Sequence, residues 1–148
     1  MASRNYKYYQ PNDKDLKDQY GDCVVRALTK VMSKTWMQVF DDLISYAKKL
    51  QCMPNGKQCY ESYLKENGFT YHGISNKKGS KRPTVDRFAK DHKSGIFFLD
   101  VANNCIGIVG MYYYKNYTFE SCLMFCYCEK SYAETVRNGR PPGMTAWC

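Results

Sequence analysis

Residues 21–32, with the sequence GDCVVRALTKVM, decide the fold. Their apolar residues recur at helical spacing around a broad face, which predicts a helix from Asp22 onward. Because so wide an apolar face needs cover on several sides, we expect this helix to lie deep in the core. Cys23 stands where the irregular segment before it enters the helix, and Ser33-Lys34-Thr35 ends the helix.

Three further helices are predicted from start signals and apolar stripes. Thr35 with Gln38 three positions later forms a capping box, and the apolar stripe over 36–50 predicts the second helix. A third helix is expected over about 57–66, after a Pro-Asn-Gly turn. A short fourth helix is expected over 85–91, opened by Pro83-Thr84.

The second half of the chain predicts strands. One strand is expected within 69–82, before a basic loop, and another over 95–101. Residues 105–114 suggest one long strand, bulged at its glycines, and 122–128 a further strand. Helices first and strands later indicate an α+β domain, in which an N-terminal helical half packs on a mainly antiparallel C-terminal sheet.

Length and composition favour a single domain over residues 1–148, with an extended lead-in over 1–20 and an irregular tail over 129–148. The chain has 148 residues, of which 44% are hydrophobic, so it can bury a core and is not disordered as a whole. No run of about 18 uncharged apolar residues occurs, so no membrane partner is expected. No export signal is recognisable, which predicts a cytoplasmic protein.

The eight cysteines are expected to be reduced thiols in such a compartment. The densest group is Cys122, Cys126 and Cys128, and no CxxC pair occurs in the chain. On an alternating strand these three point to one face, as small buried hydrophobic residues do. We therefore expect no metal site and no cofactor.

Cys23 is the residue with the clearest chemical potential. A cysteine at a helix N-terminus feels the positive end of the helix dipole, which lowers the pKa of the thiol and favours the nucleophilic thiolate. The amides of the first turn, with Gln19 as a further donor, suit an oxyanion hole. The alternative is that Cys23 simply packs at the start of a buried helix.

Several segments, in their order and spacing, resemble the small papain-like cysteine peptidases of phages and Gram-positive bacteria, distant relatives of the bacteriocin-processing peptidases. The resemblance covers roughly residues 20–125 and implies a papain-like fold with Cys23 as nucleophile. The matching segments are GDCVVRAL at 21–28, CMPN at 52–55, YLKENGF at 63–69, KRPTV at 81–85 and the strand from Gly95 to Asn103.

The resemblance places the general base, a histidine, at position 104, where this chain has Asn104. The carboxylate that orients the base falls on Tyr117, or on Asn116 with the gap drawn differently. Asparagine can orient a group but cannot carry a proton, so peptide hydrolysis is expected to be negligible. The predicted catalytic positions are Cys23, Gln19 and Asn104, and the predicted substrate-binding residues are Asp22, Trp36, Asn103 and Tyr117.

The chain has two histidines that could replace the missing base. We expect His72 to lie in a loop at the end of a strand and His92 to be solvated at the end of a helix. Neither stands where the resemblance places a base, although a rescue of catalysis by one of them stays open.

The net charge of +8 favours anionic partners, and the segment 77–93 carries +5 of it. The alternative is a solvated basic surface. The predicted anion-binding residues are Lys77, Lys78, Lys81, Arg82 and Arg87.

Two function classes follow, with a weaker third. The first is a degraded peptidase homologue, phage-encoded and located in the host cytoplasm, that binds a protein or peptide in the old cleft without cutting it. The second is an active thiol hydrolase that uses Cys23 with a non-standard base. The third is a protein that binds nucleic acid through 77–93.

Overall fold

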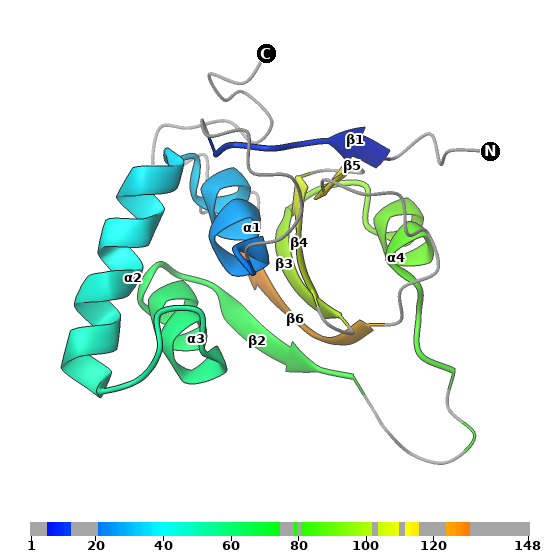
Figure 1. Ribbon diagram of the computed structural model, residues 1–148. Helices are drawn as coiled ribbons and strands as arrows, with labels where there is room; N and C mark the ends of the chain where they lie inside the picture. Colours follow the sequence, from blue (N-terminus) through cyan, green and yellow to red (C-terminus); the bar gives the residue numbers. More distant parts are fainter. Residues whose placement is uncertain are drawn as a thin grey trace.

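The computed structural model describes residues 6–12, 21–74, 79, 81–101, 104–109, 112–115 and 124–130. Four helices and six strands occur in these ranges (Figure 1). The helices are α1 (Cys23–Met32), α2 (Trp36–Leu50), α3 (Lys57–Glu66) and α4 (Val85–Asp91). The strands are β1 (Tyr6–Tyr8), β2 (Thr70–Gly73), β3 (Ile96–Val101), β4 (Asn104–Val109), β5 (Tyr112–Lys115) and β6 (Met124–Lys130).

The helices begin and end where their signals predict. Thr35 and Gln38 form the capping box of α2, and the side chain of Thr84 accepts a hydrogen bond from the Arg87 amide at the start of α4. α1 and α2 both end on a residue in the left-handed conformation, Ser33 and Gln51, each with φ of 54°. These ends turn the chain sharply, so the three N-terminal helices pack on one another.

The strands form one sheet in the order β1-β5-β4-β3-β6-β2. β1 pairs with β5 in parallel, and the other four pairs are antiparallel. The predicted α+β class is therefore confirmed, with a mainly antiparallel sheet. No helix in the described ranges is long and apolar enough to cross a membrane.

Three sequence-based boundaries were wrong. Residues 105–114 do not form one bulged strand, because Val109 pairs with Tyr112 and makes β4 and β5 an antiparallel hairpin. The last strand extends to Lys130, two residues into the expected tail over 129–148. The expected lead-in over 1–20 contains β1, which is an edge strand of the sheet. Residues 13–20 of this lead-in lie outside the described ranges.

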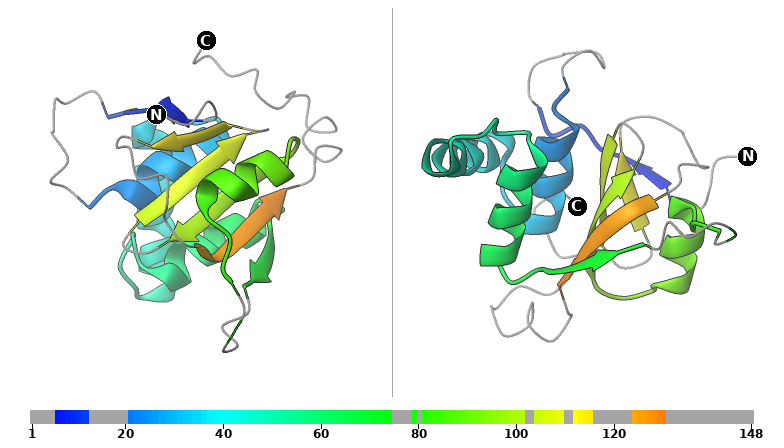
Figure 2. Two further views of the ribbon diagram at one scale, coloured as in Figure 1. Left: turned by 90° about the vertical axis from the view of Figure 1, so that its right-hand side faces the viewer. Right: turned by 90° about the horizontal axis from the view of Figure 1, so that it is seen from below.

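Helices cover both faces of the sheet, where the sequence predicted cover from a helical half alone (Figure 2). Residues Ile96 and Phe98 of β3 join the larger core with α1, α2 and α3. The alternate residues of β3 join a smaller cluster under α4. That cluster consists of Val85, Phe88, Ala89, Phe97, Leu99 and Val101. We call the two sides the α1 face and the α4 face.

α1 is buried almost all round, as its broad apolar pattern predicts. It packs on β3, β4 and β5, while α2 covers a second side. The segment after β1 covers a third side, because the Tyr9 hydroxyl lies 3.0 Å from Oγ1 of Thr29. Even Lys30 is only 5% exposed, with its ammonium 5.4 Å from the centre of the Tyr9 ring. The start of α1, with Cys23, is therefore held firmly against the sheet.

Candidate functional site

Cys23 is the first residue of α1 and is half-buried against the larger core. Asp22 takes the N-cap position, but among the described residues its side chain makes no cap hydrogen bond. The carboxylate turns instead to two other side chains. Its Oδ2 accepts a hydrogen bond of 3.1 Å from Nε1 of Trp36, and its Oδ1 lies 3.0 Å from Nε of Arg26.

Two of the predicted substrate-binding residues, Asp22 and Trp36, therefore lie side by side, but their polar groups bond to each other. The Trp36 ring also stacks on Phe40 one turn later in α2, with centroids 5.0 Å apart. Within the described part of the chain, Nε of Arg26 makes no well-directed hydrogen bond, so its contact with Asp22 is an ion pair only. Asp22 thus fastens α2 to the start of α1 and positions Cys23 from beside it.

The other predicted positions near Cys23 are only partly described. Asn104 is the first residue of β4, and its backbone partner is Val101 at the end of β3. The backbone of Asn104 therefore lies at the turn of this hairpin, on a strand that packs against α1. Gln19, Asn103, Asn116 and Tyr117 lie outside the described residues.

His92 lies at the end of α4, as predicted, but it is half-buried on the α4 face and is not simply solvated. Its ring stacks on Phe88, with centroids 3.8 Å apart, and meets the edge of Phe97 at 5.3 Å. Its Nδ1 lies 2.9 Å from the Phe88 carbonyl oxygen. Both aromatic partners belong to the cluster under α4, so this imidazole is separated from Cys23 by the sheet.

His72 also lies on the α4 face, within strand β2 and not in a loop as predicted. His72 pairs with position 127 of β6, and position 127 pairs in turn with Leu99 of β3. Leu99 belongs to the cluster under α4. Residues paired directly across strands share a face. Nε2 of His72 lies 3.2 Å from Oε2 of Glu129, which pairs with Phe97 and so shares that face. Neither imidazole is thus on the side of the sheet that carries Cys23.

The predicted anion-binding segment is partly neutralised by its own acids. Arg87 Nε lies 3.4 Å from Asp91, and Lys90 Nζ lies 2.6 Å from Asp86. Both pairs follow the i, i+4 spacing of α4 and are exposed at their basic ends. Lys81 is exposed and Arg82 is half-buried, while Lys77 and Lys78 lie outside the described residues. These contacts favour a solvated basic surface over a preformed anion site.

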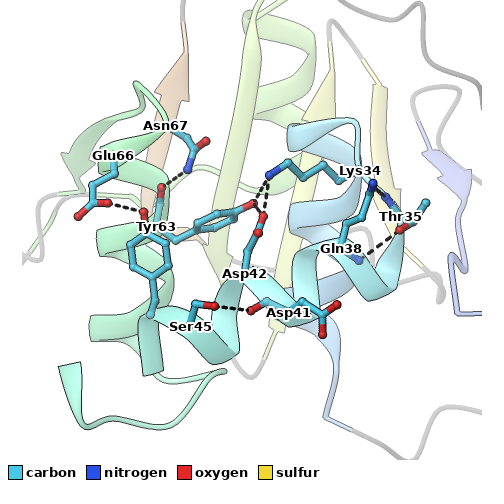
Figure 3. Close-up of polar contacts among 10 residues, drawn as sticks. Lys34, Thr35, Gln38, Asp41, Asp42, Ser45, Tyr63, Glu66 and Asn67 are labelled. Carbon is cyan, nitrogen blue, oxygen red and sulfur yellow. Dashed lines mark hydrogen bonds and ion pairs between the residues drawn. The ribbon is translucent and has the colours of Figure 1, made fainter. Parts of the chain in front are cut away.

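A polar network that the sequence did not predict joins the three N-terminal helices (Figure 3). Lys34 Nζ lies 2.6 Å from Oδ2 of Asp42, and the Tyr63 hydroxyl donates to the same oxygen at 2.7 Å. Lys34 also donates to the Tyr63 hydroxyl at 3.3 Å. Lys34 follows α1, Asp42 lies in α2 and Tyr63 lies in α3, so the network fixes the relative position of the three helices.

The ionisation of this network is perturbed in the directions that stabilise it. Burial by itself raises the pKa of Asp42, but hydrogen bonds from Lys34 and Tyr63, with the charge of Lys34, bring the pKa below its ordinary value of 3.8. Burial and the bond to Asp42 raise the pKa of Tyr63. Next to it, burial and a hydrogen bond to Glu66 raise the pKa of Tyr46 to about 12.

Two surface grooves of about 530 Å³ lie away from Cys23. The first runs between α3 and the edge strand β2, over a floor of Phe69 and Cys128. The second lies at the end of α2, and Cys52 and Met53 form part of its wall. Cys128 in the first groove is almost fully buried in the larger core, as predicted. No group of three or more potential metal ligands occurs among the described side chains.

No protein-family model, no curated protein and no solved structure matches the chain significantly. Cys23 lies on one face of the sheet and the two histidines lie on the other, and this placement limits the chemistry open to the thiol.

Proposed function

We propose that the chain is a catalytically inactive relative of the small papain-like cysteine peptidases, phage-encoded and located in the host cytoplasm. It binds a peptide or an extended protein segment beside Cys23 without cutting it. The observation that carries this proposal is that His72 and His92 both lie on the α4 face, while Cys23 packs on the α1 face.

The chemistry of a thiol peptidase explains why this placement matters. A base must take the proton of the thiol, and an acid must protonate the leaving amine; each role contributes typically about 10²–10⁴-fold in rate. His72 is engaged by Glu129 and His92 by Phe88, with the sheet between them and Cys23. Asn104 at the position of the family base has no ionisable proton to exchange.

The architecture around Cys23 supports descent from such an enzyme. The cysteine begins a helix that is covered on several sides, and that helix packs on a mainly antiparallel sheet whose four strands β3 to β6 come from the second half of the chain. Asp22 and Trp36 brace the start of this helix through their hydrogen bond. We assign these two a positioning role, with the bound segment contacting Cys23 itself.

One observation favours a second candidate, an active thiol hydrolase. Asp22 leaves the first amides of α1 without a side-chain cap among the described residues, and such amides stabilise both a thiolate and an oxyanion. A thiolate there would still react with strong electrophiles. Turnover of a peptide would need a base that is neither His72 nor His92.

The test compares binding with cleavage at the same residue. Casein, an unfolded protein with many different peptide bonds, is incubated with the full chain, and fragments are followed by mass spectrometry. We expect no fragments beyond those formed with the Cys23→Ser variant. A peptide pool prepared from casein should slow the alkylation of Cys23 by iodoacetamide, in proportion to the occupied fraction.

A matched control uses Cys52, which like Cys23 is a half-buried thiol among the described residues. The peptide pool should leave the alkylation rate of Cys52 unchanged, since Cys52 lies at the far end of α2. Cleavage that depends on Cys23 would replace the proposal with the hydrolase. Absence of both cleavage and protection would reject both functions.

A further inference from the structure

Cys52 and Cys59 lie at the connection between α2 and α3, where the chain folds back on itself. After the left-handed residue Gln51, the Cys52 amide donates to the Ala47 carbonyl at 3.1 Å. A tight turn follows, in which the Gly56 amide donates to the Met53 carbonyl at 2.9 Å. α3 starts directly after this turn, and so its first turn carries Cys59 back toward the end of α2.

The two thiols contact each other. Cys59 Sγ donates to the Leu43 carbonyl of α2 at 3.4 Å, and its side chain is hydrogen-bonded to that of Cys52. Burial, with the neighbouring Cys52, raises the pKa of Cys59 to about 11. Cys59 is therefore a protonated thiol held against α2, beside the side chain of Cys52.

Solvent reaches the two sulfurs unequally. Cys59 is 0% exposed, whereas Cys52 is half-buried and belongs to the wall of the groove at the end of α2. The groove therefore gives a small polar oxidant access to Cys52, whereas burial keeps that oxidant from Cys59. A partly accessible attacking thiol with a buried resolving thiol beside it is the arrangement of a redox-sensitive pair.

We propose that Cys52 and Cys59 form a redox pair that hydrogen peroxide converts into an intrachain disulfide between the end of α2 and the start of α3. In the first step the Cys52 sulfur attacks the peroxide, the O–O bond breaks, and one water leaves as Cys52 becomes a sulfenic acid. In the second step the Cys59 sulfur attacks Cys52, the S–OH bond breaks, and the thiol proton leaves with hydroxide as a second water. Each sulfur loses one electron, and the peroxide is reduced to two waters.

The disulfide would close the chain between residues 52 and 59 and limit the freedom of the unfolded state. For a loop this short, the expected rise of the melting temperature is roughly 5–10 °C. The same bond would fix one wall of the groove at the end of α2, because Cys52 and Met53 form part of that wall.

The experiment treats the reduced full chain with a small excess of hydrogen peroxide, then alkylates the remaining thiols and digests the protein. We expect a crosslinked peptide that joins Cys52 to Cys59, two hydrogens lighter than the reduced pair, and a higher melting temperature that dithiothreitol reverses. Cys52→Ser should remove both the crosslink and the shift and leave Cys59 as a thiol.

Two further variants complete the test. Cys23→Ser removes another half-buried thiol and should keep the crosslink. Cys59→Ala removes the buried partner, so Cys52 should stop at the sulfenic acid, which dimedone traps. The proposal is overturned if Cys52 in the unaltered chain is oxidised to a sulfinic acid without a crosslink, or if Cys59 pairs with another cysteine instead.

Discussion

The two faces of the sheet differ in how much they bury and in the chemistry they hold. The α1 face carries three helices, the larger core and Cys23. The α4 face carries the short helix α4, a cluster of six buried residues, and both histidines. The face with the larger core also holds Cys23, and both imidazoles lie on the more lightly covered face.

This separation explains why the presence of cysteine and histidine in a chain is weak support for catalysis. His92 is held by Phe88 and Phe97, and His72 by Glu129, through contacts that the packing of the α4 face provides. An imidazole placed in this way serves packing and surface charge. The three changes below test the contrast, from the largest effect to the smallest.

Core truncation should be more costly on the α1 face than on the α4 face. Leu28→Ala, in the centre of α1, should lower the free energy of unfolding by about 3–5 kcal/mol, because Leu28 is fully buried among residues that cannot close the cavity. Leu99→Ala, also fully buried but under α4, should cost about 2–3 kcal/mol, since one short helix can move into the space. Urea unfolding measures both.

The two substitutions are matched controls, because both remove the same atoms from a leucine of equal burial. Equal losses would show that the two faces form one cooperative core of uniform density. A larger loss for Leu99→Ala would reverse the comparison.

The network at Asp42 should make the α1 face sensitive to acid. The folded-state pKa of Asp42 lies below its ordinary value, so the carboxylate stabilises the fold above about pH 3.8, and this contribution is lost as the pH falls through the lower pKa. Asp42→Asn should reduce the loss of stability between about pH 6 and about pH 2.5. Tyr63→Phe, which removes a donor to Asp42, should cost about 1–2 kcal/mol near neutral pH.

Urea unfolding at several pH values gives both quantities, with Tyr60→Phe as control. Tyr60 is also buried and donates to a carboxylate, that of Asp100, at 3.2 Å. An acid profile of Asp42→Asn identical to that of the unaltered chain would show that other carboxylates dominate acid unfolding.

Substitution of the histidines should have the smallest effect, because neither change should alter the reactivity of the Cys23 thiol. His72→Gln and His92→Gln should each leave the rate of Cys23 alkylation by iodoacetamide unchanged across the range in which imidazole titrates, about pH 5 to 8. The sheet separates both rings from the sulfur. A fall in the alkylation rate that follows the titration of one histidine would place that ring beside Cys23 and contradict the comparison.

Local signals in the sequence were sufficient for the helices. Thr35 with Gln38, Thr84, and the apolar spacing from Val24 to Val31 act within one or two turns, and the structure has helices at these places. The hairpin of β4 and β5 was missed because Val109 and Tyr112 pair across a turn that an apolar run conceals. The pairing of β1 with β5 joins distant segments and leaves no local trace.

The site was less predictable, because side-chain partners depend on the packing of elements far apart in sequence. The position of Cys23 at the start of α1 follows from the sequence alone. Asp22 and Trp36 were both assigned to substrate binding, but their hydrogen bond to each other was not predicted, because Trp36 reaches Asp22 only once α2 has folded back. The contact of Lys34 with Asp42 and Tyr63 likewise needs three helices in place. No spacing rule in the sequence predicts that Asp42 of α2 meets Tyr63 of α3.

The parallel pair of β1 and β5 has a consequence for biosynthesis. Tyr6 lies opposite Tyr113, so during synthesis β1 must wait for a segment far later in the chain before it gains a partner. Contacts between such remote residues slow folding, and we expect this edge to close after the helices have docked. Until then a nascent chain exposes a tyrosine-rich strand, and chaperones that hold extended aromatic segments would meet the protein at this end.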